Sequence, residues 1–173
     1  MLIATKAFSE INPKYGTYYV LGNHDKGYYG SREFTIDELK KELIKNKVNV
    51  LEDDVVELDD LLLVGRKDKS FSGRKEMNEY ELDNNKFIVV LDHQPNDQIA
   101  EKEANADLVL SGHTHGGQLI PITYVGEWIG ANDQTKGLVT KGNTTYIVSD
   151  GISDWEIPFK TGCKAEYVVI DIE

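Results

Sequence analysis

The segment 107–118 reads DLVLSGHTHGGQ, a short apolar run followed by two histidines on a glycine-rich turn. The run Leu108-Val109-Leu110 has the length and apolar character of a buried strand. His113 and His115, one residue apart, can point at neighbouring positions, and the glycines let the backbone come close to whatever the rings hold. Histidine is the commonest metal ligand among side chains, so this turn indicates a metal site. A pair of solvated loop histidines is the alternative.

The two remaining histidines also follow short apolar runs. His24 lies in Gly22-Asn23-His24-Asp25, directly after the β-branched and aromatic run 17–21. His93 follows the run 87–91. Open α/β sheets bind ligands at the carboxyl ends of their strands, so we expect these turns to meet the 113–115 turn. Singly, each could be a solvated turn residue; together they offer four imidazoles, one amide oxygen and one carboxylate.

The composition is that of a globular protein and limits the partners of the chain. A hydrophobic content of 40% and a charged content of 28% are ordinary, and the apolar runs are too short to span a bilayer. The net charge of −11 argues against nucleic acid or an anionic membrane as a general partner. The single cysteine, Cys163, excludes an internal disulfide and a multi-cysteine zinc site.

Helices and strands alternate in the first part of the chain, and strands dominate later. Helices are expected over 1–10, 35–46 and 96–105, the second with a capping box formed by Thr35 and Glu38. Strands are expected over 17–21, 48–51, 55–58, 61–64, 87–91, 108–110, 137–140, 144–148 and 166–172. This order indicates one layered α/β domain over residues 1–173, with polar residues gathered at strand ends.

Three other features have both an ordinary and a functional interpretation. The basic side chains of the 66–81 loop are expected to be a solvated surface, with contact to a substrate phosphate as the alternative; they are Arg66, Lys67, Lys69, Arg74 and Lys75. Tyr28, Tyr29 and Trp128 are expected to pack in or around the core, with contact to a substrate base or sugar as the alternative. Cys163 has no histidine near it in sequence and is expected to be inert.

Three of these segments carry a family resemblance. Gly22-Asn23-His24-Asp25, the His93 segment and Gly112-His113-Thr114-His115 resemble, in order and spacing, the later motifs of the calcineurin-like metallophosphoesterases. The extension 116–118 looks like that of the bacterial predicted phosphohydrolases in this superfamily, and segments 146–151 and 166–172 are similar to theirs. The resemblance runs from about Tyr15 to Ile172 and implies a layered α/β/β/α metallophosphoesterase sandwich.

The resemblance also implies an activity, cofactors and roles for individual residues. It implies a metal-dependent phosphohydrolase or phosphodiesterase with two divalent ions, Mn²⁺, Fe²⁺ or Zn²⁺. Asn23, His93 and His113 would hold one ion and His115 the other, while His24 would protonate the leaving oxygen with Asp25 holding its ring. Two ions about 3.5–4 Å apart can polarise a phosphoryl group and activate a water for in-line attack. They would also place positive charge where an acidic protein must hold a phosphate-ester substrate.

The chain departs from the family pattern at its beginning. Family members start with an Asp-x-His motif and a Gly-Asp motif whose second carboxylate bridges the metals, and neither motif occurs here. We therefore expect the C-terminal portion of such a domain, incomplete at the N-terminus as a fragment or truncated gene product, impaired in activity and retaining at most one ion. The strand 17–21 would present an unpaired edge, and self-association is expected to cover it.

Two other functions compete with hydrolysis. The same fold could be a non-catalytic binding module or scaffold; the absent first motifs favour this, whereas the intact Asn23-His24-Asp25 argues for a catalytic parent. A mononuclear zinc hydrolase on another fold is disfavoured, because no Asp stands at the second or third position after His115. The expected location is cytoplasmic, or membrane-associated if an anchor precedes Met1 in the parent protein.

Overall fold

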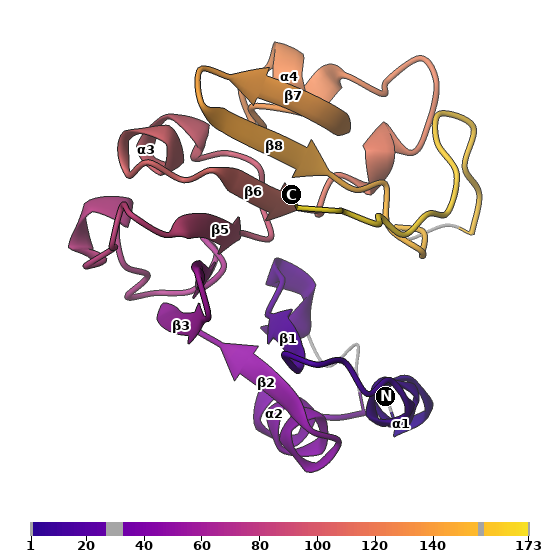
Figure 1. The fold of residues 1–173 in the computed structure, drawn as a ribbon. Helices are drawn as coiled ribbons and strands as arrows, with labels where there is room; N and C mark the ends of the chain where they lie inside the picture. Colours follow the sequence, from indigo (N-terminus) through magenta and orange to yellow (C-terminus); the bar gives the residue numbers. More distant parts are fainter. Residues whose placement is uncertain (1, 27–32, 156–157, 173) are drawn as a thin grey trace.

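Two β-sheets form the centre of the protein (Figure 1). The computed structural model describes residues 2–26, 33–155 and 158–172. The smaller sheet pairs β1 (Thr17–Val20) in parallel with β2 (Val48–Leu51). The larger sheet has six strands in the order β3-β4-β5-β6-β8-β7.

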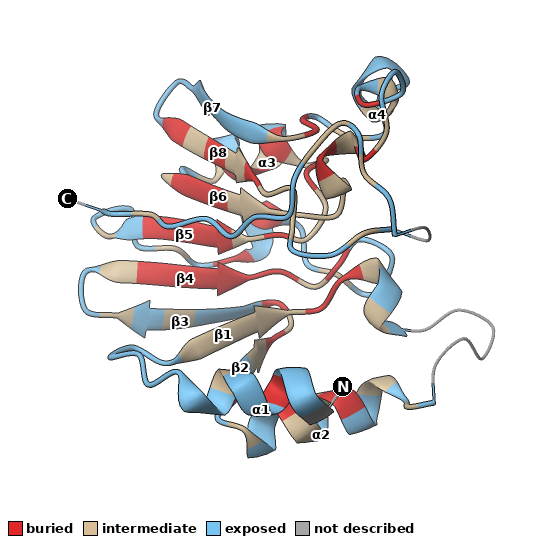
Figure 2. Ribbon diagram, turned by 90° about the vertical axis from the view of Figure 1, so that its right-hand side faces the viewer, coloured by how far each residue is buried: buried red, intermediate tan, exposed pale blue. Residues whose placement is uncertain are grey.

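The four central strands of the larger sheet are parallel. They are β4 (Leu61–Gly65), β5 (Phe87–Leu91), β6 (Leu108–Ser111) and β8 (Thr144–Val148). The antiparallel strands β3 (Asp54–Leu58) and β7 (Gly137–Lys141) flank them. The arrows of the four parallel strands point to one side in Figure 2, toward the loops that carry α4 (Val125–Trp128). The segments that follow these strands therefore gather at one edge of the sheet.

Apolar side chains alternate along the central strands and cover both faces of the larger sheet. Ile88 and Val90 of β5 join a cluster with Tyr146, on the face covered by α3 (Gln98–Glu103) and η2 (Met77–Glu79). Val89 points to the other face, into a cluster with Leu51 of β2. This second cluster holds the two sheets together, because burying apolar area is the dominant favourable term in folding.

The remaining long helices lie beside the smaller sheet (Figure 2). They are α1 (Leu2–Glu10) and α2 (Ile36–Lys45). Leu39 and Leu43 of α2 are buried in a cluster with Leu21 and Val48. The expected capping box begins α2, since the Thr35 hydroxyl accepts from Glu38 N and the Glu38 carboxylate accepts from Thr35 N.

The expected α/β fold class is confirmed: the structure has a central mixed sheet with flanking helices. The prediction of a strand over 166–172 is wrong, because this segment has no regular secondary structure. Ile170 packs into the cluster between the sheets, whereas Tyr167 and Val169 face solvent. Most apolar residues of this segment are therefore exposed, and none belongs to a described strand. None of the helices in the described part of the chain has both the length and the apolar character needed to cross a bilayer.

Candidate functional site

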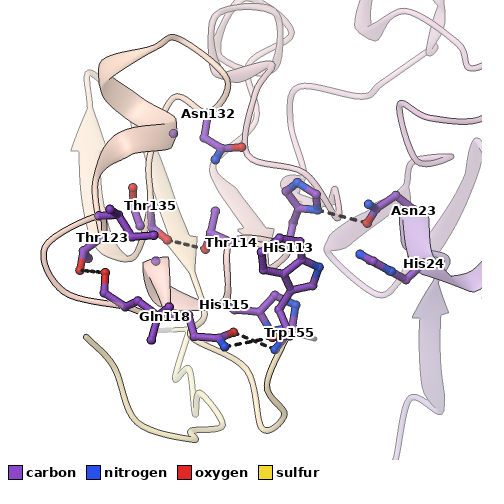
Figure 3. A pocket seen from close by; sticks show the side chains of 14 residues that line it. Asn23, His24, His113, Thr114, His115, Gln118, Thr123, Asn132, Thr135 and Trp155 are labelled. Atoms are coloured by element: carbon purple, nitrogen blue, oxygen red, sulfur yellow. Dashed lines mark hydrogen bonds between the residues drawn. The ribbon is translucent and has the colours of Figure 1, made fainter. Parts of the chain in front are cut away.

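The polar turns expected to meet do come together at the carboxyl edge of the strands. Asn23 and His24 begin η1 (Asn23–Lys26), just beyond β1. His93 follows β5, and His113 follows β6. Figure 3 shows Asn23 and His24 on one side of a pocket, opposite His113 on the other.

The carboxamide oxygen of Asn23 is the meeting point of two histidines. It lies 3.1 Å from Nε2 of His93 and 3.2 Å from Nδ1 of His113. The two rings lie edge to face, with centroids 5.2 Å apart. Residues 70 and 90 positions away in sequence thus converge on one atom, which local sequence preferences alone do not impose.

The turn that carries His113 and His115 is held in left-handed backbone conformations. His113 has φ of 68°, His115 of 50° and Gln118 of 35°. Such values cost of order 1–3 kcal/mol for residues other than glycine and cluster at functional sites. The two glycines pack against protein and not against a ligand, since a Cβ on Gly116 would lie 2.4 Å from Asp150 Oδ1 and one on Gly117 2.1 Å from the Thr123 carbonyl oxygen.

Burial keeps the two central imidazoles neutral at physiological pH. Desolvation lowers the pKa of His93, opposed by the carboxylates of Asp68 and Asp25. Desolvation, with the charge of His93, lowers the pKa of His113 to about 4. The neighbouring imidazoles of His24 and His115 lower the pKa of both rings further. Neutral imidazole is the form that binds metal ions, so these rings are in the right protonation state to be ligands.

Two of the donor–donor distances among Asn23, His93 and His113 are compatible with ligands of one divalent ion. Two ligand atoms about 2.1 Å from one ion, at octahedral or tetrahedral angles, are about 3.0–3.4 Å apart. The distances of 3.1 and 3.2 Å match this spacing. Among the described residues, no group of three or more His, Cys, Asp and Glu side chains could hold a metal ion; the set found here has two imidazoles and one amide. Its role as a ligand set stays a prediction.

The other expected site residues surround this set. The Asp25 carboxylate accepts from the Tyr19 hydroxyl (3.0 Å) and from Gly22 N (2.8 Å). Nδ1 of His115 lies 3.3 Å from the carbonyl oxygen of Ser153. A metal-binding histidine commonly donates its second ring nitrogen to a backbone carbonyl, so this contact is compatible with a ligand role for the opposite nitrogen. The roles of His24 as acid and Asp25 as its orienting group stay predictions.

Two basic residues of the 66–81 loop, Arg66 and Arg74, are not part of the solvated surface expected from the sequence, whereas Lys69 and Lys75 are exposed. Arg66 is 1% exposed and contacts Asp92 (3.0 Å) and Asp97 (2.6 Å). Arg74 also pairs with Asp92. Burial and the neighbouring Asp92 raise the pKa of Glu101 to about 8, so this residue holds its proton at neutral pH. Both arginines therefore form buried ion pairs with Asp92, the residue before His93. They are not placed to contact a substrate phosphate.

Asp68 is a residue near the site that the sequence interpretation missed. Its side chain is fully buried, and both carboxylate oxygens accept from Nε2 of Gln94, at 2.9 and 3.0 Å. Ser70 N donates to the same carboxylate (2.8 Å). No ion pair of Asp68 is found within the described ranges of the chain, yet its charge reaches His93 and His113. The only signal in the sequence is an acidic residue within a basic loop.

Two cavities meet at the histidines. The first, which we call the histidine chamber, has a volume of about 730 Å³ and is lined by Tyr19, Asp25 and Asp150 together with all four histidines. The second, which we call the apolar chamber, has a volume of about 810 Å³ and is lined in part by Leu119 and Ile122. His24, His113, His115 and Trp155 line both chambers.

The aromatic residues considered in the sequence have different positions. Tyr28 and Tyr29 lie outside the described residues. Trp128 is largely exposed on α4 and does not pack in the core. Cys163 lies close to the histidine turn, since its Sγ donates to the carbonyl oxygen of His115 (3.0 Å).

Comparison with known proteins gives several similar chains. An uncharacterized metallophosphoesterase of Campylobacter jejuni is 29% identical over 95% of this chain and 44% of its own length. One of Bacillus subtilis is 28% identical over 92% of this chain and 61% of its own length. A transmembrane protein with a metallophosphoesterase domain from Bos taurus is 27% identical over 94% and 40%. No solved structure matches the chain significantly.

The chain spans about half the length of the curated relatives it matches. The model of one protein family covers most of it: the calcineurin-like phosphoesterase family matches residues 3–117, which include the Asn23, His93, His113 and His115 turns. With well over half of its length matched, this chain belongs to the calcineurin-like phosphoesterase family.

Proposed function

We propose that this chain hydrolyses phosphate esters in a metal-dependent reaction, with Asn23, His93 and His113 as ligands of a divalent ion. The observation that carries the proposal is the convergence of both ring nitrogens on the Asn23 oxygen, at distances typical of neighbouring ligands. Membership of the calcineurin-like phosphoesterase family supports the reaction class. The depressed pKa values of both rings support their availability as ligands.

Each remaining site residue has a proposed part in this reaction. When bound, divalent ions supply Lewis-acid polarisation of the phosphoryl group and a nucleophile that is active at neutral pH. His115 is assigned to a second ion position, with its Nδ1 turned to Ser153. His24 lines both chambers and donates a proton to the leaving oxygen as general acid, a role that histidine often takes in catalysis. Asp25, whose carboxylate accepts from the Tyr19 hydroxyl and Gly22 N, is assigned to hold the ring of His24.

The experiment that tests these roles compares esters with good and poor leaving groups. The protein is assayed with Mn²⁺ on bis(4-nitrophenyl) phosphate and on diphenyl phosphate. A general acid matters more when the leaving oxygen is more basic, so His24→Ala should lower turnover of the phenyl ester by about 10²–10⁴-fold and of the nitrophenyl ester much less. Metal content should be unchanged in His24→Ala.

His113→Ala should lower metal content and turnover of both esters together, because it removes a ligand. Elemental analysis of the purified variants for Mn, Fe and Zn supplies the second readout. Equal losses on both esters in His24→Ala would remove the acid role, and full metal content in His113→Ala would remove the ligand role. A non-catalytic scaffold predicts no turnover by the parent chain and no response to either substitution.

A further inference from the structure

The substrate specificity of the site can be inferred from the apolar chamber. This chamber is continuous with the proposed reaction centre, because His24, His113 and His115 line it as well as the histidine chamber. Its volume of about 810 Å³ lies within the range of pockets that bury drug-sized ligands. A phosphoryl group held among the histidines would therefore place its ester substituent at the entrance of this chamber.

The chamber offers no charged side chain to a ligand beyond its histidines. None of the described residues that line it is Asp, Glu, Lys or Arg. Its apolar walls come from Leu119, Ile122 and Trp155. A second phosphate or another charged substituent would find no counter-charge there, and desolvating such a group without a partner is costly. The lining thus disfavours nucleoside polyphosphates and other substrates with a second charged group.

Several polar side chains of the lining are already engaged within the protein. The Thr114 hydroxyl donates to the carbonyl oxygen of Thr135 (2.5 Å), and the Thr123 hydroxyl to that of Leu119 (3.3 Å). Gln118 donates to the carbonyl oxygen of Trp155 and accepts from Trp155 N (Figure 3). It also donates to the carbonyl oxygen of Phe159. These groups shape the chamber more than they offer hydrogen bonds to a ligand.

Apolar side chains are also exposed around the chamber. Ile122 is 56% and Trp155 52% exposed while lining it. The segments around Ile122 and Trp155 carry further large exposed apolar residues, namely Ile120, Trp128, Ile129, Ile152 and Phe159. A concentration of exposed apolar groups beside a pocket marks a binding site.

We propose that the apolar chamber binds the alcohol portion of the substrate, and that the substrate class is an amphiphilic phosphoester with an alkyl or aryl substituent. This inference rests on the proposed function, which places the phosphoryl group among the histidines. Ile122 and Trp155 are the residues that set this specificity, through contact with the apolar substituent.

The test measures binding without turnover. The chain has two tryptophans, so Trp128→Phe leaves Trp155 as the only one and as a fluorescent reporter in the chamber wall. This variant is titrated, with Mn²⁺ present, with methyl-, butyl- and octylphosphonate and with inorganic phosphate. Affinity should rise by about two- to fourfold for each methylene added, until the chamber is filled. Inorganic phosphate and methylphosphonate should bind with similar, weaker affinity.

Ile122→Ser in the same background should lower octylphosphonate affinity at least fivefold and leave methylphosphonate affinity unchanged. Ile99→Ser is the matched control, because Ile99 is also exposed (75%, against 56% for Ile122) but lies on α3, away from the chamber. Thermal melting of each variant confirms that it is folded. Equal affinity for methyl- and octylphosphonate overturns the inference, as does an Ile122→Ser effect shared by all ligands.

Further outcomes distinguish this inference from a membrane-binding surface and from the proposed function. A response that begins only above the critical micelle concentration, or only with phosphatidylcholine vesicles, would overturn the chamber in favour of a membrane-binding surface. Chain-length-dependent binding without hydrolysis of any ester would remove the proposed function but support the chamber as an apolar ligand site. Hydrolysis of the esters without chain-length-dependent binding would support the proposed function and remove the chamber as the site of the apolar substituent.

Discussion

Gly22 packs directly against the ring of His93. A Cβ placed on Gly22 would lie 2.7 Å from both Cε1 and Nε2 of that ring, closer than real Cβ contacts allow. Nε2 is also the atom that faces Asn23. The absence of a side chain at position 22 therefore sets how closely His93 approaches the Asn23 oxygen, and links the turn after β1 to the turn after β5.

The substitution Gly22→Ala should displace the His93 ring and weaken metal retention. Overpacking of this kind typically costs 1–3 kcal/mol of stability, and elemental analysis should show a lower metal content than in the parent protein. Gly112→Ala is the control, because a Cβ there meets no atom within 4 Å although the residue adjoins His113. Equal metal content in the two variants would show that the Gly22 contact does not position His93.

Asp68 should support cation binding through its charge. A carboxylate this buried lacks a cationic partner among the described ion pairs, and an ion at Asn23, His93 and His113 would provide one. Asp68→Asn should lower Mn²⁺ affinity by about 10–100-fold, as replacement of supporting residues around metal sites commonly does. Asp83→Asn, at an exposed turn, is the control. Competition titration with a chelating dye measures both, and unchanged affinity in Asp68→Asn would exclude this role.

Arg66 should be essential for folding and not for substrate binding. Its guanidinium is buried against Asp92, Asp97 and Glu101, and breaking a buried ion pair by removing one partner costs about 3–5 kcal/mol. Arg66→Met should lower the free energy of unfolding by that amount in urea denaturation. Lys69→Met, at an exposed position in the same loop, should change it by less than about 0.5 kcal/mol. A stable Arg66→Met protein with impaired substrate binding would restore the phosphate-contact interpretation.

Asp53 should make stability depend on acidic pH. Burial would raise its pKa, but hydrogen bonds from Lys67 N, the Tyr80 hydroxyl and Lys75 N, with the Lys67 charge, outweigh it and hold the pKa below 3.8. A carboxylate whose pKa is lower in the folded state stabilises above its unfolded pKa and loses that contribution as the pH falls through the folded value.

Asp53→Asn should therefore cost about 1.5–3 kcal/mol at pH 7, the usual scale for hydrogen bonds to a charged group, and progressively less as the pH falls below about 3.9 and Asp53 becomes protonated. Asparagine also tolerates the left-handed backbone of this position, where φ is 65°, so the substitution tests charge and not strain. Urea denaturation of both proteins between pH 2 and 7 gives the comparison. A difference independent of pH would attribute the effect to packing.

Much of the fold followed from local patterns in the sequence. The β5 run FIVVL is apolar at every position, as expected of a strand buried on both faces, and Gly142-Asn143 marks the turn between β7 and β8. The 166–172 segment has the same β-branched and aromatic character without a described strand partner. Composition reports that a segment prefers an extended backbone, but pairing depends on which edge the rest of the chain leaves available.

The sequence by itself determined which residues stand at strand ends, and so predicted that the turns with Asn23, His93 and His113 would meet. Asn23 follows a strand of the smaller sheet, whereas both histidines follow strands of the larger one. Only the tertiary structure decided the environment of each side chain. It buried Arg66 and Arg74 against Asp92, placed Asp68 within reach of two histidines, and opened an apolar chamber beside them. The reason is physical: strand period and turn chemistry are local properties, whereas desolvation, ion pairing and cavity shape depend on residues brought together from distant parts of the chain.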